Sequence, residues 1–233
     1  ERWVFRSARR VNVVSAGFLP YLKEIYDKCE TRVFTNGIDR EFLEFDIYPS
    51  NNNELPLVLY TGNIGQGQGL HNIIPSIAAL MEGQVQFRVL GDGAEKSTLQ
   101  DIIHTSQLNN VDIIDPVKRI ELINHYCEAD ILFLHLNDYK AFNKVLPSKI
   151  FEYAATGKPI LAGAVGYAAD FLRENVLGVE VFTPCNEHEM QVGLIKLLNG
   201  VKKFDRTEFC SFYTREKIMD TMAKDILSLT SGD

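Results

Sequence analysis

The sequence predicts an α/β domain built on a parallel β-sheet with helices on both faces. Short apolar runs of strand length alternate with segments whose apolar residues recur every three or four positions. The runs are nearly continuous in apolar residues, as expected for parallel strands that are buried on both faces. In such sheets ligands bind beyond the carboxyl ends of the strands, so the loops that follow the strands should carry the function.

The expected elements follow one another regularly after a polar break at 50–53. Strands are expected at 57–60, 87–90, 111–114, 131–136, 159–162 and 179–182. Helices are expected at 70–80, 99–103, 119–126, 148–156, 168–173, 187–198 and 214–229. Before the break, short strands at 11–14 and 32–34 flank a helix that Ser15 can cap. This order predicts a single domain with a doubly wound, Rossmann-like core at 54–200, preceded by a segment at 1–53 and followed by a closing helix within 201–233.

Composition and charge exclude several classes of protein. The chain has 233 residues, 45% of them hydrophobic, which is enough to build a core. Its net charge of −7 argues against nucleic acid as the main partner. No apolar run reaches the roughly 18 residues that span a bilayer. Four widely spaced cysteines, at positions 29, 127, 185 and 210, predict no metal site and no disulfide framework, as in a cytoplasmic protein.

A glycine-rich loop follows the expected strand at 57–60. Four glycines lie within the eight residues 62–69, between a strand and a helix. Glycine lets the backbone approach a ligand, and a helix start offers free N–H groups, so this loop suits a phosphate; a tight turn explains it equally well. The spacing excludes the dinucleotide fingerprint, because Leu70 stands where its last glycine belongs. A nicotinamide-dependent oxidoreductase is therefore a minor alternative.

Two further loops carry groups that suit a nucleotide. Asp92 lies between two glycines after a strand, where an acid can bind ribose hydroxyls or cap a turn. Ser148 lies in the first turn of the helix expected at 148–156, with Lys149 close behind and Glu152 one turn further on. We expect the N–H groups near 145–148 and the Lys149 ammonium to hold a diphosphate without metal, and Glu152 to accept hydrogen bonds from sugar hydroxyls. A capped helix with surface charges is the alternative.

Five stretches follow one another in a fixed order, and the last of them together with the loop at 62–65 is a specific combination. They are NGID at 36–39, YTGNIG at 60–65, VLGDG at 89–93, a tyrosine followed by Ala-Asp at 126–130, and LPSKIFEYAATGKPI at 146–160. The chain thereby resembles, over nearly its whole length, the C-terminal domain of GT-B glycosyltransferases of the retaining family four. It is especially similar to bacterial polysaccharide enzymes that transfer N-acetyl-fucosamine or related acetamido sugars.

The resemblance implies a role for individual residues. The residues expected to bind the donor nucleotide are Gly62, Asn63, Gly65, Gln68, Gly91, Asp92, Pro116, Val117, Lys118, Val145, Leu146, Pro147, Ser148 and Glu152. Among them, Glu152 matches the glutamate that binds the ribose, and 116–118 matches the loop that holds the base. The implied substrate is a nucleotide-sugar, with UDP favoured over GDP, and no further cofactor or metal is implied.

Three positions depart from the family's pattern. Asn63 stands where an arginine is common and Gln68 where a lysine is common, so two positive charges are missing. We expect Lys149 and Lys144 to replace them and to be the catalytic residues. Lys144 also stands eight positions before Glu152, where the family has a first glutamate that contacts the donor sugar.

The resemblance further implies the reaction and its partners. It implies transfer of a hexose or acetamido sugar, with retention, in the synthesis of a surface polysaccharide. The acceptor, a glycan or a polyprenyl-linked glycan, belongs mainly to an N-terminal domain that this chain is expected to lack, so the chain alone should bind donor but transfer little. The full enzyme is expected in the cytoplasm, peripheral to the inner face of the membrane. A natural half of a split transferase is the alternative.

Overall fold

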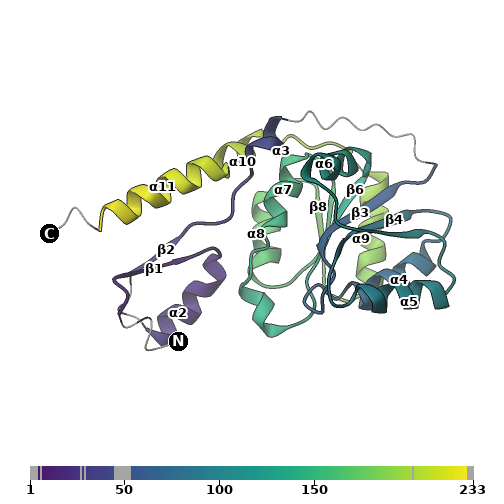
Figure 1. Cartoon of the computed structure of the whole chain (residues 1–233), viewed down its shortest axis with the longest axis horizontal. Coiled ribbons are helices and arrows are strands. Elements are labelled where there is room, and N and C mark those ends of the chain that lie inside the picture. The colour runs from purple at the N-terminus through teal and green to yellow at the C-terminus, as the bar shows by residue number, and fades with distance from the viewer. Residues whose placement is uncertain are drawn as a thin grey trace.

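The structure is a computed structural model that describes residues 5, 7–26, 28, 30–44, 54–200 and 202–229. The polar break expected at 50–53 and Cys29 lie outside these residues. Figure 1 shows a large α/β body and, beside it, a smaller unit made of the first strands and the last helix.

The large body is built on a six-stranded sheet in which every pairing is parallel. Its strands are β3 (Leu57–Asn63), β4 (Gln86–Asp92), β5 (Val111–Ile114), β6 (Ile131–His135), β7 (Ile160–Gly163) and β8 (Val179–Phe182). They lie in the order β5-β4-β3-β6-β7-β8. The chain thus builds outward from β3 in one direction and from β6 in the other, which places the topological switch point between these two strands. This confirms the predicted doubly wound α/β fold.

Helices cover both faces of this sheet. One face packs against α4 (Leu70–Leu80), α5 (Lys96–Thr105) and α9 (Glu187–Asn199). The other packs against α6 (Arg119–Glu128), α7 (Lys149–Ala155) and α8 (Tyr167–Asn175), with the short helices α3 (Arg40–Glu44) and α10 (Thr207–Phe212) at its edge. Neighbouring strand residues alternate between the two cores, as Val58 and Leu59 do. The burial of all five residues of β6 explains why its sequence is apolar without alternation.

The first two strands form a sheet of their own. β1 (Arg10–Val13) and β2 (Glu30–Val33) pair in parallel, joined by a 3₁₀ turn η1 (Ala16–Phe18) and the helix α2 (Leu19–Ile25). The predicted cap is confirmed, because the Ser15 hydroxyl accepts a hydrogen bond from the amide of Gly17 at 3.2 Å. The sequence indicated these strands without showing that they pair apart from the main sheet.

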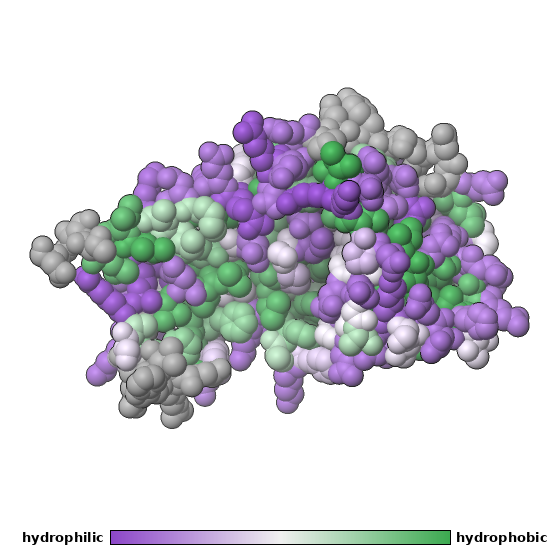
Figure 2. All heavy atoms as spheres, in the orientation of Figure 1, coloured by the Kyte–Doolittle hydropathy of each residue, from purple (hydrophilic) through white to green (hydrophobic). Residues whose placement is uncertain are grey.

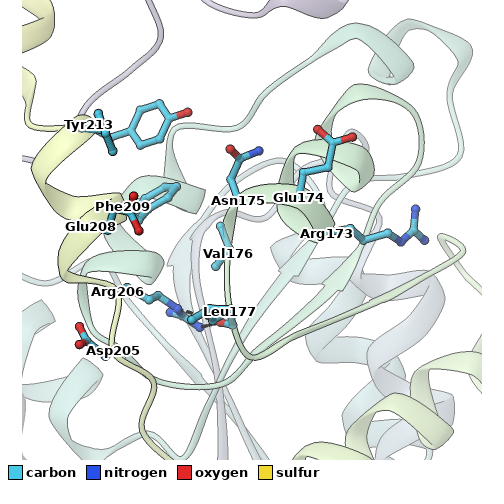
Figure 3. A pocket seen from close by; sticks show the side chains of 11 residues that line it. Arg173, Glu174, Asn175, Val176, Leu177, Asp205, Arg206, Glu208, Phe209 and Tyr213 are labelled. Carbon is cyan, nitrogen blue, oxygen red and sulfur yellow. Dashed lines mark hydrogen bonds between the residues drawn. The ribbon is translucent and has the colours of Figure 1, made fainter.

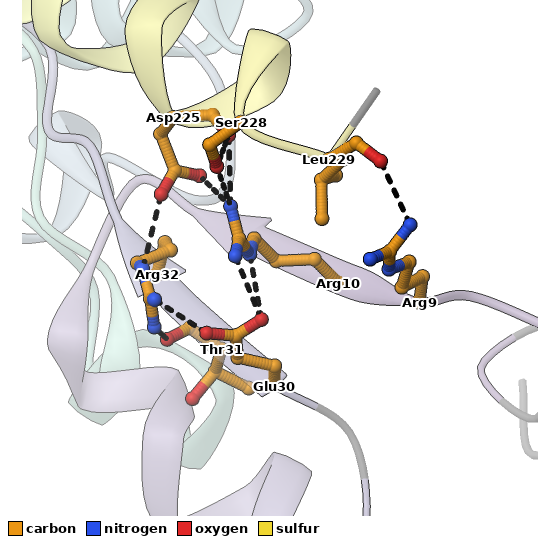
Figure 4. Close-up of polar contacts among 8 residues, drawn as sticks. All are labelled: Arg9, Arg10, Glu30, Thr31, Arg32, Asp225, Ser228 and Leu229. Carbon is orange, nitrogen blue, oxygen red and sulfur yellow. Dashed lines mark hydrogen bonds and ion pairs between the residues drawn. The ribbon is translucent and has the colours of Figure 1, made fainter. Parts of the chain in front are cut away.

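The last helix, α11 (Arg215–Leu227), lies against this small sheet. Asp225 forms ion pairs with Arg10 at 2.8 Å and with Arg32 at 3.1 Å, and Arg10 also pairs with Glu30 (Figure 4). None of the residues of α11 is fully buried. Apolar side chains lie at the surface over this part of the molecule (Figure 2), and Met219 and Ile226 of α11 are among the exposed large hydrophobics.

Candidate functional site

A pocket of about 370 Å³ lies at the carboxyl ends of β3 and β4. It is lined by Thr61, Gly62, Asn63, Leu90, Gly91, Asp92, Pro116, Val117, Leu122 and Lys149. Seven of these ten residues belong to the set expected from the sequence. The pocket lies at the edge of the sheet where doubly wound folds bind their ligands. Thr61, Leu90 and Leu122 were not expected; the last two, with Val117, give the pocket apolar walls.

The two loops that form its floor are held together by backbone contacts. Gly62 and Gly91 are partners in the β3–β4 register, and a Cβ on Gly91 would lie only 1.8 Å from the Gly62 carbonyl oxygen. Any side chain at position 91 would therefore push the strands apart. The carboxylate of Asp92 accepts a hydrogen bond from the Gly93 amide at 2.8 Å, so this acid caps its own turn as well as lining the pocket.

Asn63 and Gln68, the two uncharged residues that depart from the family's pattern in the glycine-rich loop, contact each other. The side-chain amide of Asn63 donates to Oε1 of Gln68 at 2.7 Å. A Cβ on Gly65 would come within 2.6 Å of the same Asn63 amide nitrogen, so the loop closes tightly under this pair. The two positions where the resemblance leads us to expect cations thus hold a matched amide pair, and their departures from the pattern are structurally coupled.

Lys149 and Glu152 form an ion pair on the first turn of α7. The Lys149 ammonium lies 2.8 Å from Oε2 of Glu152, and the two side chains are 23% and 18% exposed. Lys149 lines the pocket, and Glu152 is bound to it by this ion pair without being one of the lining residues. The helix thus presents a cation and a carboxylate side by side, which suits recognition of a phosphate next to a sugar hydroxyl.

Three hydroxyl groups that the sequence left without a role lie behind this pair. Tyr126 donates to Oε2 of Glu152 at 3.1 Å. The Thr61 hydroxyl lies 3.1 Å from the phenol of Tyr126 and 3.3 Å from that of Tyr153. Burial raises the pKa of both phenols, so both stay protonated and can donate. Tyr126 belongs to a stretch that carries the family resemblance. That resemblance is the signal in the sequence that could have pointed to this residue.

The remaining predicted residues lie outside the pocket lining. The amide of Val145 donates to the Phe142 carbonyl at 3.0 Å, which occupies one donor expected for the diphosphate. Leu146 is buried, whereas Ser148 is exposed. Lys118 is an exposed residue at the start of α6.

Lys144 lies at the end of a 3₁₀ turn, η2 (Lys140–Lys144), beside the small unit. Its ammonium lies 4.1 Å from the centre of the Tyr21 ring, and the hydroxyl of Ser15 donates to its carbonyl oxygen. Lys144 is therefore engaged with the β1–β2 unit, and Lys149 is the lysine that lines the pocket.

A larger pocket of about 630 Å³ lies at the opposite edge of the sheet, between the end of α8 and α10 (Figure 3). None of the predicted site residues lines it. Its buried Arg206 donates to four backbone carbonyls, those of Tyr153, Ala154, Lys158 and Leu177. The guanidinium thus caps the end of α7, which gives the buried arginine of this pocket a structural role.

The described residues contain no group of three or more histidine, cysteine, aspartate or glutamate side chains able to hold a metal ion. Of the helices they form, none is long and apolar enough to cross a bilayer.

Comparison with known proteins identifies the family. The family model described as "Glycosyl transferases group 1" matches residues 44–208, which is most of the chain and includes every residue of the pocket. The chain belongs to the group 1 glycosyltransferases. Its curated relatives are bacterial proteins named as glycosyltransferases. It is 28% identical over 111 residues to a protein of Escherichia coli K12 named as a colanic acid biosynthesis glycosyl transferase, WcaI, and 23% identical over 171 residues to WbjE of Pseudomonas aeruginosa, a probable glycosyltransferase.

These matches cover 48% and 69% of this chain but 27% and 42% of the relatives.

Solved structures share the fold of this group 1 glycosyltransferase chain. HepE from Anabaena, in complex with UDP and glucose, matches with a TM-score of 0.79 at 19% identity, over 97% of this chain and 64% of HepE. A glycosyltransferase from Rickettsia africae matches with a TM-score of 0.77 at 16% identity, over all of this chain and 67% of that protein. The GT-B fold of these neighbours agrees with the predicted class.

Proposed function

We propose that this chain is the donor-binding part of a glycosyltransferase that moves a hexose or an acetamido sugar from a nucleoside diphosphate, with UDP as the favoured base. The observation that carries the proposal is the Lys149–Glu152 pair beside the pocket, 2.8 Å apart and partly exposed. The acceptor is a glycan or a polyprenyl-linked glycan of a surface polysaccharide. It is bound mainly by an N-terminal domain outside this chain, in an enzyme that works in the cytoplasm at the inner membrane face.

In this proposal each group has a role in binding. The base lies between Pro116 and Val117 and the apolar walls of the pocket, with its ribose toward Glu152. The carboxylate accepts hydrogen bonds from the ribose hydroxyls, and Lys149 contacts the diphosphate. During transfer the bond between the anomeric carbon of the sugar and the diphosphate breaks, and negative charge grows on the departing phosphate oxygen. The anomeric carbon forms a new bond to an acceptor hydroxyl oxygen, whose proton passes to the departing diphosphate. Lys149 stabilises that charge without a metal ion, since a preorganised cation lowers the barrier for charge that develops in the transition state. Retention of configuration is proposed on the family resemblance.

The test is a calorimetric titration of the chain with UDP, GDP, dTDP and NAD. The proposal expects binding of a nucleoside diphosphate, UDP above the others, and none of NAD. Glu152→Ala should weaken UDP binding about tenfold or more, because a hydrogen bond to a charged group contributes about 1.5–3 kcal/mol. Glu187→Ala, which removes an exposed glutamate from the first turn of α9, is the matched control. Unchanged UDP affinity in Glu152→Ala would remove its role, and binding of NAD alone would favour an oxidoreductase.

A further inference from the structure

A chain of hydrogen bonds runs from the backbone of β3 to the carboxylate of Glu152. The amide of Thr61 donates to the phenol oxygen of Tyr153 at 3.0 Å. The Thr61 hydroxyl then lies between the phenols of Tyr153 and Tyr126, at 3.3 Å and 3.1 Å. Tyr126 completes the chain by donating to Oε2 of Glu152 at 3.1 Å.

Counting the available hydrogens gives the direction of each hydrogen bond in this network. Each hydroxyl has one hydrogen to give. Tyr126 gives its hydrogen to Glu152, so it must accept the one from Thr61. Thr61 must then accept the hydrogen of Tyr153, whose oxygen already accepts from the Thr61 amide. All three hydroxyls donate once and accept, and the donors point toward the carboxylate.

The two tyrosine rings of this network are buried and packed against aromatic neighbours. Tyr126 and Tyr153 are almost completely buried, and their rings meet edge to face with centroids 5.7 Å apart. The other side of Tyr126 packs against Phe42, with centroids 5.8 Å apart. The Tyr126 phenol therefore offers Glu152 a fixed donor on a rigid support.

This arrangement leaves one oxygen of Glu152 for a ligand. Oε2 accepts hydrogen bonds from both Tyr126 and Lys149. Within the part of the chain that the structure describes, no hydrogen bond reaches Oε1. A carboxylate with one oxygen held by two donors presents its other oxygen in a defined direction.

We propose that Thr61, Tyr153 and Tyr126 are positioning residues that orient Glu152 so that Oε1 accepts hydrogen bonds from the ribose diol of the donor. The proposal rests on the nucleotide-binding function proposed above. It predicts that these buried hydroxyls, none of which needs to touch the ribose, set the preference of the site for ribose over a sugar without the 2′ and 3′ hydroxyls.

The experiment compares two ligands on the unaltered chain and on four variants by calorimetric titration. The ligands are UDP and 2′,3′-dideoxy-UDP, which differ only in the diol. The unaltered chain should prefer UDP by about tenfold or more, as a charged hydrogen bond to the diol requires. In Tyr126→Phe this preference should fall severalfold, while affinity for the dideoxy nucleotide stays within about twofold. Tyr213→Phe, a half-buried tyrosine beside α10, is the control and should keep the full preference.

A second pair of variants distinguishes loss of the hydroxyl from loss of the fold. Thr61→Val removes the hydroxyl and keeps the shape, and should lower the preference as Tyr126→Phe does. Thr61→Ser keeps the hydroxyl and should therefore retain the preference for UDP over the dideoxy nucleotide. A purely structural role would lower the affinity for both nucleotides alike, and retention of the full preference in Tyr126→Phe and Thr61→Val would overturn the proposal. If the unaltered chain binds neither nucleotide, it is the proposed function that fails.

Discussion

His135 donates from Nδ1 to the carbonyl oxygen of Gln68 at 2.6 Å and so ties the end of β6 to the glycine-rich loop. Its other ring nitrogen accepts from the amide of Cys185 at 3.1 Å. The Gln68 carbonyl can only accept and the Cys185 amide can only donate, so the ring must be neutral with its hydrogen on Nδ1. The side chain is 1% exposed and lies against Gly163, where a Cβ would come within 2.1 Å of the ring. This histidine supports the loop from beneath and does not face the pocket.

Acid should therefore destabilise the protein through His135. Burial lowers the pKa of His135 to about 4, below the value of about 6.5 for an unfolded chain. Between these values the unfolded state binds the extra proton, so the stability that this group contributes is complete above pH 6.5 and is lost as the pH falls toward 4. The loss from pH 7 to pH 5 should be about 2 kcal/mol, measured by urea unfolding at both values.

The matched variants separate this histidine from other titrating groups. His135→Gln keeps one donor and one acceptor without the titration, so it should lose clearly less stability between pH 7 and pH 5. His104→Gln, at an exposed position of α5, should behave like the unaltered chain. An equal loss in all three chains would show that His135 does not titrate as argued.

Lys149 should act on the phosphates rather than on the nucleoside. Lys149→Gln removes a charge that lines the pocket, so the affinity for UDP should fall about tenfold while the affinity for uridine changes little. Titrations with both ligands at low and moderate salt measure this, and the effect on UDP should shrink as salt screens the charge. The control is Lys196→Gln, an exposed lysine of α9 that pairs with Glu180. Equal weakening of UDP and uridine would mean that Lys149 works through Glu152 instead.

Asp225 should hold α11 against the small sheet. It pairs with Arg10 and Arg32, and its side chain is largely buried between them (Figure 4). Asp225→Asn removes the charge from both pairs, so amide hydrogen exchange in β1 and α11 should become severalfold faster while β3 and β6 stay protected. Asp220→Asn, an exposed residue of the same helix that pairs with Lys224, is the control. Unchanged exchange in β1 would show that apolar contacts alone hold the helix.

Much of the fold could be predicted, because its main elements leave local signals. The expected strand at 179–182 coincides with β8, and the helix expected at 70–80 coincides with α4. The short helices α3 and α10 were missed, because five or six residues are too few to show a helical period. The residues of the pocket were predicted in large part for the same reason: glycines and polar groups that end a parallel strand must lie at one edge of the sheet.

The sequence by itself determined the α/β class, the alternation of strands and helices, and the loops that could meet a ligand, because side-chain periodicity and turn chemistry are local properties. Only the tertiary structure decided that β1 and β2 pair apart from the main sheet, that Asn63 bonds Gln68, and that Lys149 rather than Lys144 lines the pocket. It also decided the chain of hydroxyls behind Glu152, whose members Thr61 and Tyr153 are 92 residues apart. Contacts between side chains of distant elements depend on the packing of whole helices against the sheet, and no short pattern in the sequence records that packing.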